Sequence, residues 1–175
     1  MHIKYVESEK IAKFIIKWKL LVSKYDLYFL YPPITIVYTS PPMSEKMLKF
    51  VEIGQQNPPK RDKNSRKEDF NEIYSEFIKG KANEQSSRCS QCGVPFCQVH
   101  CPLSNNIPDW LKLTAEGRHE EAYQLSQSTN NMPEVCGRIC PQDRLCEGNC
   151  VIEQSGHGTV TIGSIEKYIT ETAWE

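Results

Sequence analysis

The stretch "RCSQCGVPFCQVHCPLSNNIPDW" (residues 88–110) contains four cysteines, at positions 89, 92, 97 and 101. A second stretch, "CGRICPQDRLCEGNC" (residues 136–150), contains four more, at positions 136, 140, 146 and 150. Together these are all eight cysteines of the chain, so every thiol falls in one of two short segments. Three chemistries compete to explain the pattern: disulfide bonds, zinc and iron–sulfur clusters.

The spacing favours iron and sulfur. Cysteines three to five residues apart in turns rarely reach the Cα separation of a disulfide with each other. Zinc sites usually use two short C-x2-C pairs, and only residues 89–92 have that spacing. Each segment also has a Cys-Pro dipeptide, at 101–102 and 140–141, as bacterial two-cluster ferredoxins do. Disulfides and zinc remain open as less favoured alternatives.

The overall composition points to few partner classes. The chain has 175 residues, a net charge of −1 and an isoelectric point near 6.4, which give no reason to expect nucleic acid or an anionic membrane as a partner. Closely grouped cysteines in a reducing compartment more often bind metal than form disulfides. We therefore expect a cytoplasmic protein that binds neither nucleic acid nor a membrane.

The N-terminal residues differ in composition from the rest of the chain. Residues 10–38 are apolar and aromatic but contain several charged side chains, and their longest apolar run, residues 27–38, includes two prolines. A membrane-spanning helix needs ~20 predominantly apolar residues, and no signal-peptide pattern is present. We interpret residues 1–42 as an N-terminal extension, consistent with an overlong start assignment, and residues 43–175 as one functional domain.

Hydrophobic periodicity predicts helices in this domain and no strands. The helices are expected within residues 66–80, 107–117, 118–133 and 161–175. In the first, Phe70, Ile73 and Tyr74 begin an apolar stripe that ends at Gly80; in the second, Pro108 marks the start and Gly117 the end. Trp110 is expected in the core, and Arg88 and Arg138 on the solvated surface. The fold class is therefore mainly α, a small helical domain around whatever the cysteines bind.

Three stretches resemble a known family: "RCSQCGVPFCQVHCPLSNNIPDW", "NNMPEVCGRICPQDRLCEGNC" (residues 130–150) and "VTIGSIEKYI" (residues 160–169). They are similar to the N-terminal iron–sulfur domain, an α-helical ferredoxin-like domain, of glutamate synthase small chains and dihydropyrimidine dehydrogenases. The resemblance covers roughly residues 46–175. The upstream "EIGQQNPPKRDKNSRKEDFNEIY" (residues 52–74) is closer to the glutamate synthase branch.

The resemblance implies two 4Fe–4S clusters whose ligands cross between the two cysteine segments. Carried over residue by residue, the ligands would be Cys89, Cys92, Cys97 and Cys150 for the first cluster, and Cys101, Cys140, Cys146 and Glu166 for the second. Cys136 would be a spare cysteine. The assignment of Glu166 as a ligand also has support from the sequence itself. Glu166 falls on the same helical stripe as Ile162 and Ile165, and a buried glutamate needs a partner or a metal.

The resemblance also implies a role in electron transfer. In the family this domain precedes a part that binds FAD and NADPH, and such a part carries G-x-G-x-x-G after a strand. This sequence has no such motif. We therefore expect an electron-transfer module that works with the FAD- and NADPH-binding part of a small chain and with the FMN-containing glutamate synthase large chain. The alternatives are the equivalent domain of a dihydropyrimidine dehydrogenase-like oxidoreductase and a zinc-stabilised interaction module.

Overall fold

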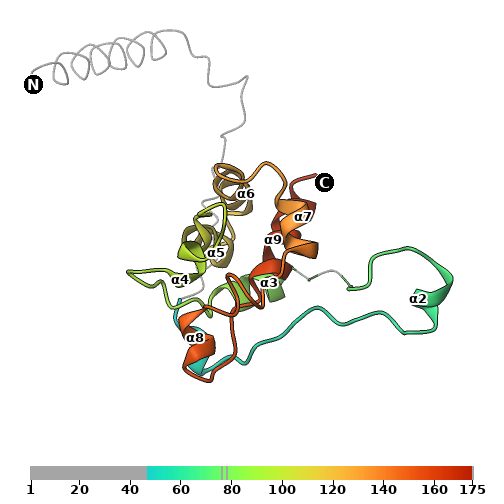
Figure 1. Ribbon diagram of the computed structural model, residues 1–175, viewed down its shortest axis with the longest axis horizontal. Coiled ribbons are helices and arrows are strands. Elements are labelled where there is room, and N and C mark those ends of the chain that lie inside the picture. Colours follow the sequence, from blue (N-terminus) through green and yellow to red (C-terminus); the bar gives the residue numbers. More distant parts are fainter. Residues whose placement is uncertain (1–46, 76, 78, 175) are drawn as a thin grey trace, which may run out of the picture. The chain divides into compact units, whose positions relative to one another are not determined.

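The computed structural model describes residues 47–75, 77 and 79–174, which all fall in one compact unit. The N-terminal extension inferred for residues 1–42 lies outside this part of the chain. The helices, labelled in Figure 1, are η2 (Lys49–Val51), α2 (Ser65–Glu68), α3 (Lys79–Ser86), α4 (Phe96–Val99), α5 (Ile107–Ala115), α6 (His119–Gln127), α7 (Pro133–Ile139), α8 (Val151–Gln154) and α9 (Ile162–Thr172).

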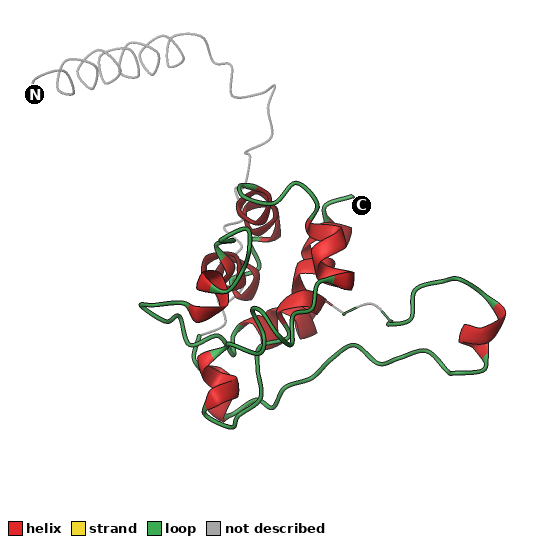
Figure 2. Cartoon of the chain, viewed as in Figure 1, coloured by secondary structure: helices red, strands yellow, loops and turns green. Residues whose placement is uncertain are grey.

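The described residues contain no strand, only one isolated antiparallel bridge between Lys60 and Tyr74 (Figure 2). The predicted mainly α fold is confirmed. None of the helices within residues 47–174 has the length and apolar character to cross a membrane.

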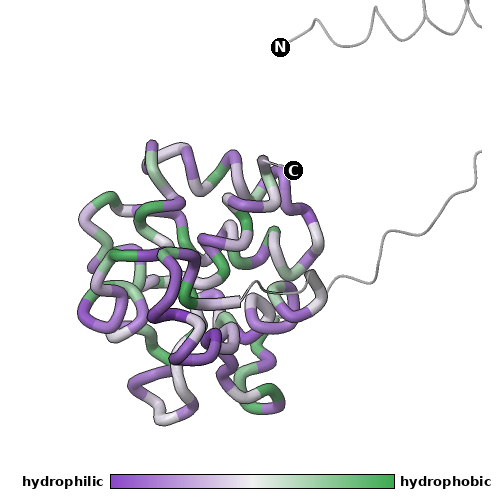
Figure 3. The backbone as a smooth tube through the Cα atoms, turned by 90° about the vertical axis from the view of Figure 1, so that its right-hand side faces the viewer, coloured by the Kyte–Doolittle hydropathy of each residue, from purple (hydrophilic) through white to green (hydrophobic). Residues whose placement is uncertain are grey.

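The hydrophobic core lies mainly on α3, α5, α6 and α9, which pack together, and α7 packs against α9. Trp110 of α5 is fully buried and its indole N–H donates to Asn105 Oδ1 at 3.0 Å, which confirms its predicted place in the core. Hydrophobic and hydrophilic stretches alternate along the tube in Figure 3, as expected for a chain in which amphipathic helices such as α5 and α9 bury one face.

The predicted bounds of the second helix are confirmed, and the backbone explains why it ends where it does. Pro108 lies in the first turn of α5, where its missing N–H is not needed. Gly117 has a φ of 77°, and the N–H groups of Gly117 and Arg118 donate to the carbonyls of Thr114 and Leu113. This pair of bonds is a Schellman motif, which needs a residue in the left-handed conformation after the helix.

The helix predicted over residues 66–80 is wrong. Among the described residues of this range, only those of the short α2 and the first two of α3, which starts at Lys79, are helical, and Gly80 lies inside α3 instead of ending a helix. Phe70, predicted on an apolar stripe, is fully exposed to solvent. Residues 55–75, here called the arm, form a long loop that carries α2 out from the other helices (Figure 1).

Polar contacts within the arm explain why the helix does not form. The Asp69 carboxylate accepts two hydrogen bonds from the Arg61 guanidinium, at 3.0 and 2.6 Å, and a third from the Asn71 N–H at 3.0 Å. The pKa of Asp69 is lowered, chiefly by the bond from Arg61. Aspartate side chains that bind nearby backbone N–H groups compete with helix formation. These contacts outweigh the apolar periodicity of the segment.

Candidate metal centre

Four cysteines from two distant segments line one small cavity of about 20 Å³. Cys89 and Cys92 come from the loop after α3, Cys97 lies in α4, and Cys150 is the residue just before α8. Apolar residues complete the lining, among them Leu111, Val160 and Ile162. The structure therefore brings together the four residues that the resemblance implied for the first cluster.

Gln91 shapes the loop around the first cavity. It has a φ of 51°, and both its backbone N–H and its side-chain amide donate to the Cys89 sulfur, each at 3.4 Å. The same amide donates to the Pro108 carbonyl at 2.7 Å, which ties the cysteine loop to the start of α5. The Ser90 hydroxyl lies 2.9 Å from the Cys92 sulfur. Hydrogen bonds to sulfur are among the means by which proteins set cluster potentials.

Burial disfavours the anionic form of the thiols in the first cavity. It raises the pKa of Cys89 to about 11 and that of Cys97 to about 12, with neighbouring cysteines adding to the effect. A bound cationic group would reverse this effect, because it stabilises thiolates that the apolar surroundings destabilise.

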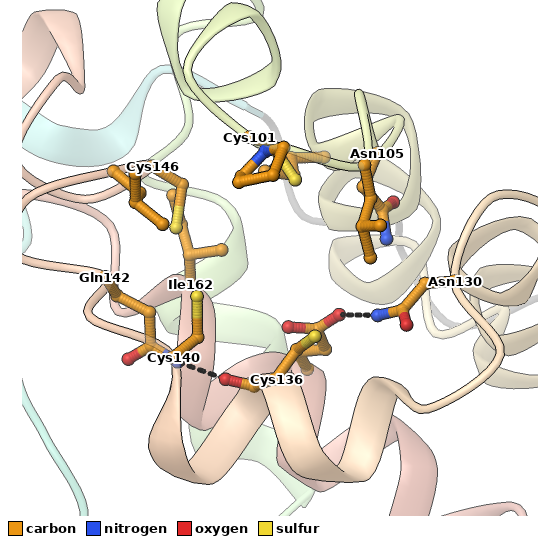
Figure 4. A pocket seen from close by; sticks show the side chains of 13 residues that line it. Cys101, Asn105, Asn130, Cys136, Cys140, Gln142, Cys146 and Ile162 are labelled. Atoms are coloured by element: carbon orange, nitrogen blue, oxygen red, sulfur yellow. Dashed lines mark hydrogen bonds between the residues drawn. The ribbon is translucent and has the colours of Figure 1, made fainter.

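A second, larger cavity of about 210 Å³ lies between α5, α7 and α9. Its lining includes the four residues that the resemblance implied for the second cluster: Cys101, Cys140, Cys146 and Glu166. Cys136 of α7 lines the same cavity, and Figure 4 shows its sulfur pointing into the space that the Cys140 and Asn130 side chains also face.

Glu166 is buried, with an exposed fraction of 7%, as its position on the apolar stripe of α9 predicted. Burial raises its pKa to about 7, and a hydrogen bond from the Asn130 amide to its Oε1, at 3.2 Å, acts in the opposite direction. The carboxyl group lines the cavity beside the cysteines. A buried carboxylate in this position is a suitable oxygen ligand for a metal.

The loop that carries Cys140 and Cys146 is fixed to the helices at both ends. The Gln142 amide donates to the Cys136 carbonyl at 2.7 Å (Figure 4). The Glu147 carboxylate accepts the Gly163 N–H at 3.0 Å, so that it caps the start of α9. Both sides of the second cavity are thereby held together.

The sequence prediction for Arg88, a solvated surface position, is wrong. Its side chain is fully buried, and its guanidinium donates to four backbone carbonyls: Ile53, His157, Gly158 and Thr159. This arrangement joins the segment before the arm to the loop before α9. Arg138 is exposed, as predicted, and pairs with Glu72 and Glu171.

Both cavities fit an iron–sulfur cluster by the chemistry of their donors. Each gathers buried or half-buried thiols from two chain segments, and all eight cysteines are free. None of the described residues that line either cavity is basic, so a cation could bind there without displacing an ion pair. Among the residues that the structure describes, no three His, Cys, Asp or Glu side chains are placed to share a single metal ion.

Sequence reasoning gave no role to Gln91, Asn130 or Glu147, which position the donors. Asn130 and Glu166 lie 36 residues apart, and no local pattern connects them. The one signal in the sequence was that Gln91 and Glu147 each lie within a cysteine segment.

Comparison with known proteins agrees with this geometry. Residues 66–175 match the family described as dihydropyrimidine dehydrogenase domain II, 4Fe-4S cluster. The glutamate synthase [NADPH] small chain of Azospirillum brasilense is 70% identical over 132 residues, 75% of this chain and 27% of that protein. The corresponding small chain of Escherichia coli is 50% identical over 133 residues, 76% of this chain and 28% of that protein.

A third relative, the putative oxidoreductase AegA of E. coli, is 49% identical over 110 residues, 62% of this chain and 16% of that protein. The chain thus spans about a quarter of the length of the small chains it matches and a smaller share of AegA. The family match covers well over half of the chain, including both cysteine segments and α9. The chain therefore belongs to the 4Fe–4S family of dihydropyrimidine dehydrogenase domain II.

Proposed function

We propose that this chain is the electron-transfer module of a glutamate synthase small chain and holds two 4Fe–4S clusters. The proposed ligands are Cys89, Cys92, Cys97 and Cys150 for the first cluster, and Cys101, Cys140, Cys146 and Glu166 for the second. One observation carries the proposal: these eight side chains divide without overlap between two cavities, four to each.

The clusters, when bound, would supply reversible one-electron transfer. The chain's own residues hold the donors in place: Gln91 and Arg88 around the first cavity, Asn130, Gln142 and Glu147 around the second. The oxygen ligand would give the second cluster a potential different from that of the first, because ligand identity is one of the main controls on potential.

The proposed partners follow from the relatives. The small chains are named for NADPH, and the proposed route runs from NADPH-reduced FAD on the rest of a small chain to FMN on a glutamate synthase large chain. The same module could serve a dihydropyrimidine dehydrogenase-like oxidoreductase, as the family description allows. The two glutamate synthase relatives, at 70% and 50% identity, favour the first role.

The test is to measure iron, acid-labile sulfide and zinc in the anaerobically purified chain, together with its visible spectrum before and after dithionite. The proposal predicts about eight irons and eight sulfides per chain and a colour that bleaches on reduction. Cys97→Ala and Cys146→Ala should each lose about half of the iron, and their double variant nearly all of it. Two zincs and no iron would show a zinc-stabilised module and overturn the proposal.

A further inference from the structure

The second cavity contains one donor more than a four-ligand site needs. Five side chains with metal-binding atoms line it: Cys101, Cys136, Cys140, Cys146 and Glu166. Two of them come from helices that pack against each other, Cys136 from α7 and Glu166 from α9. These two are therefore competing candidates for the same position.

Asn130 lies between the two candidates. It is 4% exposed, and its amide nitrogen donates to Glu166 Oε1 at 3.2 Å. Its amide oxygen accepts the Met132 N–H at 3.0 Å, which fixes the orientation of the amide and keeps the NH2 group toward Glu166. Burial raises the pKa of the Cys136 thiol, and the Asn130 amide acts in the opposite direction. In Figure 4 a dashed line marks the hydrogen bond from Asn130, and the Cys136 sulfur faces the same space.

Hydrogen bonds to their backbone carbonyls help to hold both Glu166 and Cys136 at the cavity, whichever of the two binds the metal. The Thr170 hydroxyl donates to the Glu166 carbonyl at 2.8 Å within α9, and the Gln142 amide donates to the Cys136 carbonyl. A thiolate is the softer ligand and the usual one for iron–sulfur clusters. A carboxylate can take this position only if the protein orients it there, and the bond from Asn130 to Oε1 leaves Oε2 as the free donor.

We propose that Asn130 selects the fourth donor of the second cavity by orienting the Glu166 carboxylate, and that Cys136 takes the position when Glu166 cannot. This inference rests on the proposed function, because it requires a cluster in the second cavity. Asn130 acts here as a positioning residue and Cys136 as a replacement ligand.

Four variants of the full chain test the inference, with iron content and the Mössbauer spectrum of 57Fe-loaded protein as readouts. Glu166→Ala should keep about eight irons but lose the signal of an oxygen-ligated iron. Cys136→Ala should keep the iron and that signal. Glu166→Ala combined with Cys136→Ala should lose about half of the iron. Asn130→Asp, which keeps an acceptor for Met132 but repels Glu166, should give the spectrum of Glu166→Ala with full iron.

The outcomes separate the two proposals. If the parent chain holds about eight irons but Glu166→Ala alone loses half of them, the replacement role of Cys136 is wrong while the proposed function stands. If Asn130→Asp retains the parent spectrum, the selecting role of Asn130 is wrong. If the parent chain itself lacks iron, the proposed function fails first. The Asn130→Asp and Glu166→Ala spectra are read on iron-loaded protein, so they remain decisive even if the double variant does not fold.

Discussion

A Cβ atom built on Gly137 of α7 would lie 2.8 Å from the backbone nitrogen of Lys167 in α9. It would also lie 3.0 Å from the Gly163 carbonyl oxygen, so α7 meets the backbone of α9 with no room for a side chain. This contact places Cys136, the neighbour of Gly137, and Glu166, the neighbour of Lys167, on the same cavity. The geometry of the second cavity therefore depends on Gly137, which has no metal-binding side chain of its own.

Gly137→Ala should destabilise the domain. The added methyl group meets backbone atoms that cannot move without separating the helices, and overpacking of this kind costs about 1–3 kcal/mol. Alanine regains roughly 1 kcal/mol through its higher helix propensity, so we expect a net loss of up to about 2 kcal/mol in the free energy of unfolding. Urea unfolding followed by circular dichroism measures it.

Gly80→Ala is the matched control, since Gly80 lies in helix α3, is exposed and would place its Cβ in open space. This change should stabilise the protein by about 0.5–1 kcal/mol. Equal effects of the two substitutions would show that the contact between α7 and α9 is looser than the structure has it.

Arg88→Met should be strongly destabilising. The guanidinium is fully buried and serves four backbone carbonyls, and a methionine leaves those carbonyls without donors. Losing charged hydrogen bonds from a buried group costs about 3 kcal/mol or more. Arg144→Met, at an exposed position, should change the free energy of unfolding by less than about 0.5 kcal/mol. A similarly small change for Arg88→Met would contradict its role in joining the two segments.

The sequence predicted those features that depend on neighbouring residues. Pro108 and Gly117 give correct bounds for α5 because the start and stop of a helix are set within a few residues. The burial of Glu166 followed from the helical periodicity of Ile162 and Ile165, which are themselves buried. The clustering of the cysteines predicted a metal centre in these segments, and the resemblance to the family implied how the donors divide between two sites.

Features that depend on distant partners were missed. The partners of Arg88 are backbone carbonyls 35 and about 70 residues away along the chain. Every residue has a backbone carbonyl, so the sequence does not indicate which of them a side chain will bind. The apolar spacing of Phe70, Ile73 and Tyr74 predicted a helix, but the pairing of Arg61 with Asp69 bends the segment into the arm. Apolar periodicity indicates which face a helix would bury, but it does not indicate whether another element packs against that face.

Glu72 anchors the arm to the helices, and its removal should loosen the arm. Its carboxylate lies 3.0 Å from Arg138 Nε and 3.2 Å from Lys167 Nζ. Burial alone would raise the pKa of Glu72, but the bonds from Lys167 and Arg138 outweigh it and lower the pKa. The pairs are partly exposed, so Glu72→Gln should accelerate amide exchange in the arm by only about two- to fivefold.

Hydrogen exchange at the Arg61 and Ser75 amides measures this effect, because both donate to carbonyls across the arm, those of Ile73 and Pro59. Glu68→Gln, in the exposed helix α2, is the control and should leave exchange unchanged. The effect of Glu72→Gln should shrink at about 1 M salt, where charges on the surface are screened. An effect that is independent of salt would mean that Glu72 acts through packing instead of charge.

Iron retention at the first cavity should weaken as the pH falls. Burial raises the pKa of Cys89 to about 11 and of Cys97 to about 12, above the ordinary value of 9.0. At neutral pH the metal-free thiols are therefore protonated, and metal binding must release those protons. Lower pH favours the protonated, metal-free form, so chelator-driven iron loss should increase steadily from pH 8 to pH 6. Iron release that does not vary over this range would contradict the direction of the thiol pKa values.

Gln91→Met should move this iron loss to higher pH. The Gln91 side-chain amide donates to the Cys89 sulfur and lowers its pKa, partly offsetting the effect of burial. Without that donor the thiolate is less stable, so protons compete with iron more effectively at any given pH. Gln124→Met, on the exposed part of α6, is the control. If the two variants release iron with the same pH profile, the hydrogen bond from Gln91 contributes nothing to the stability of the first site.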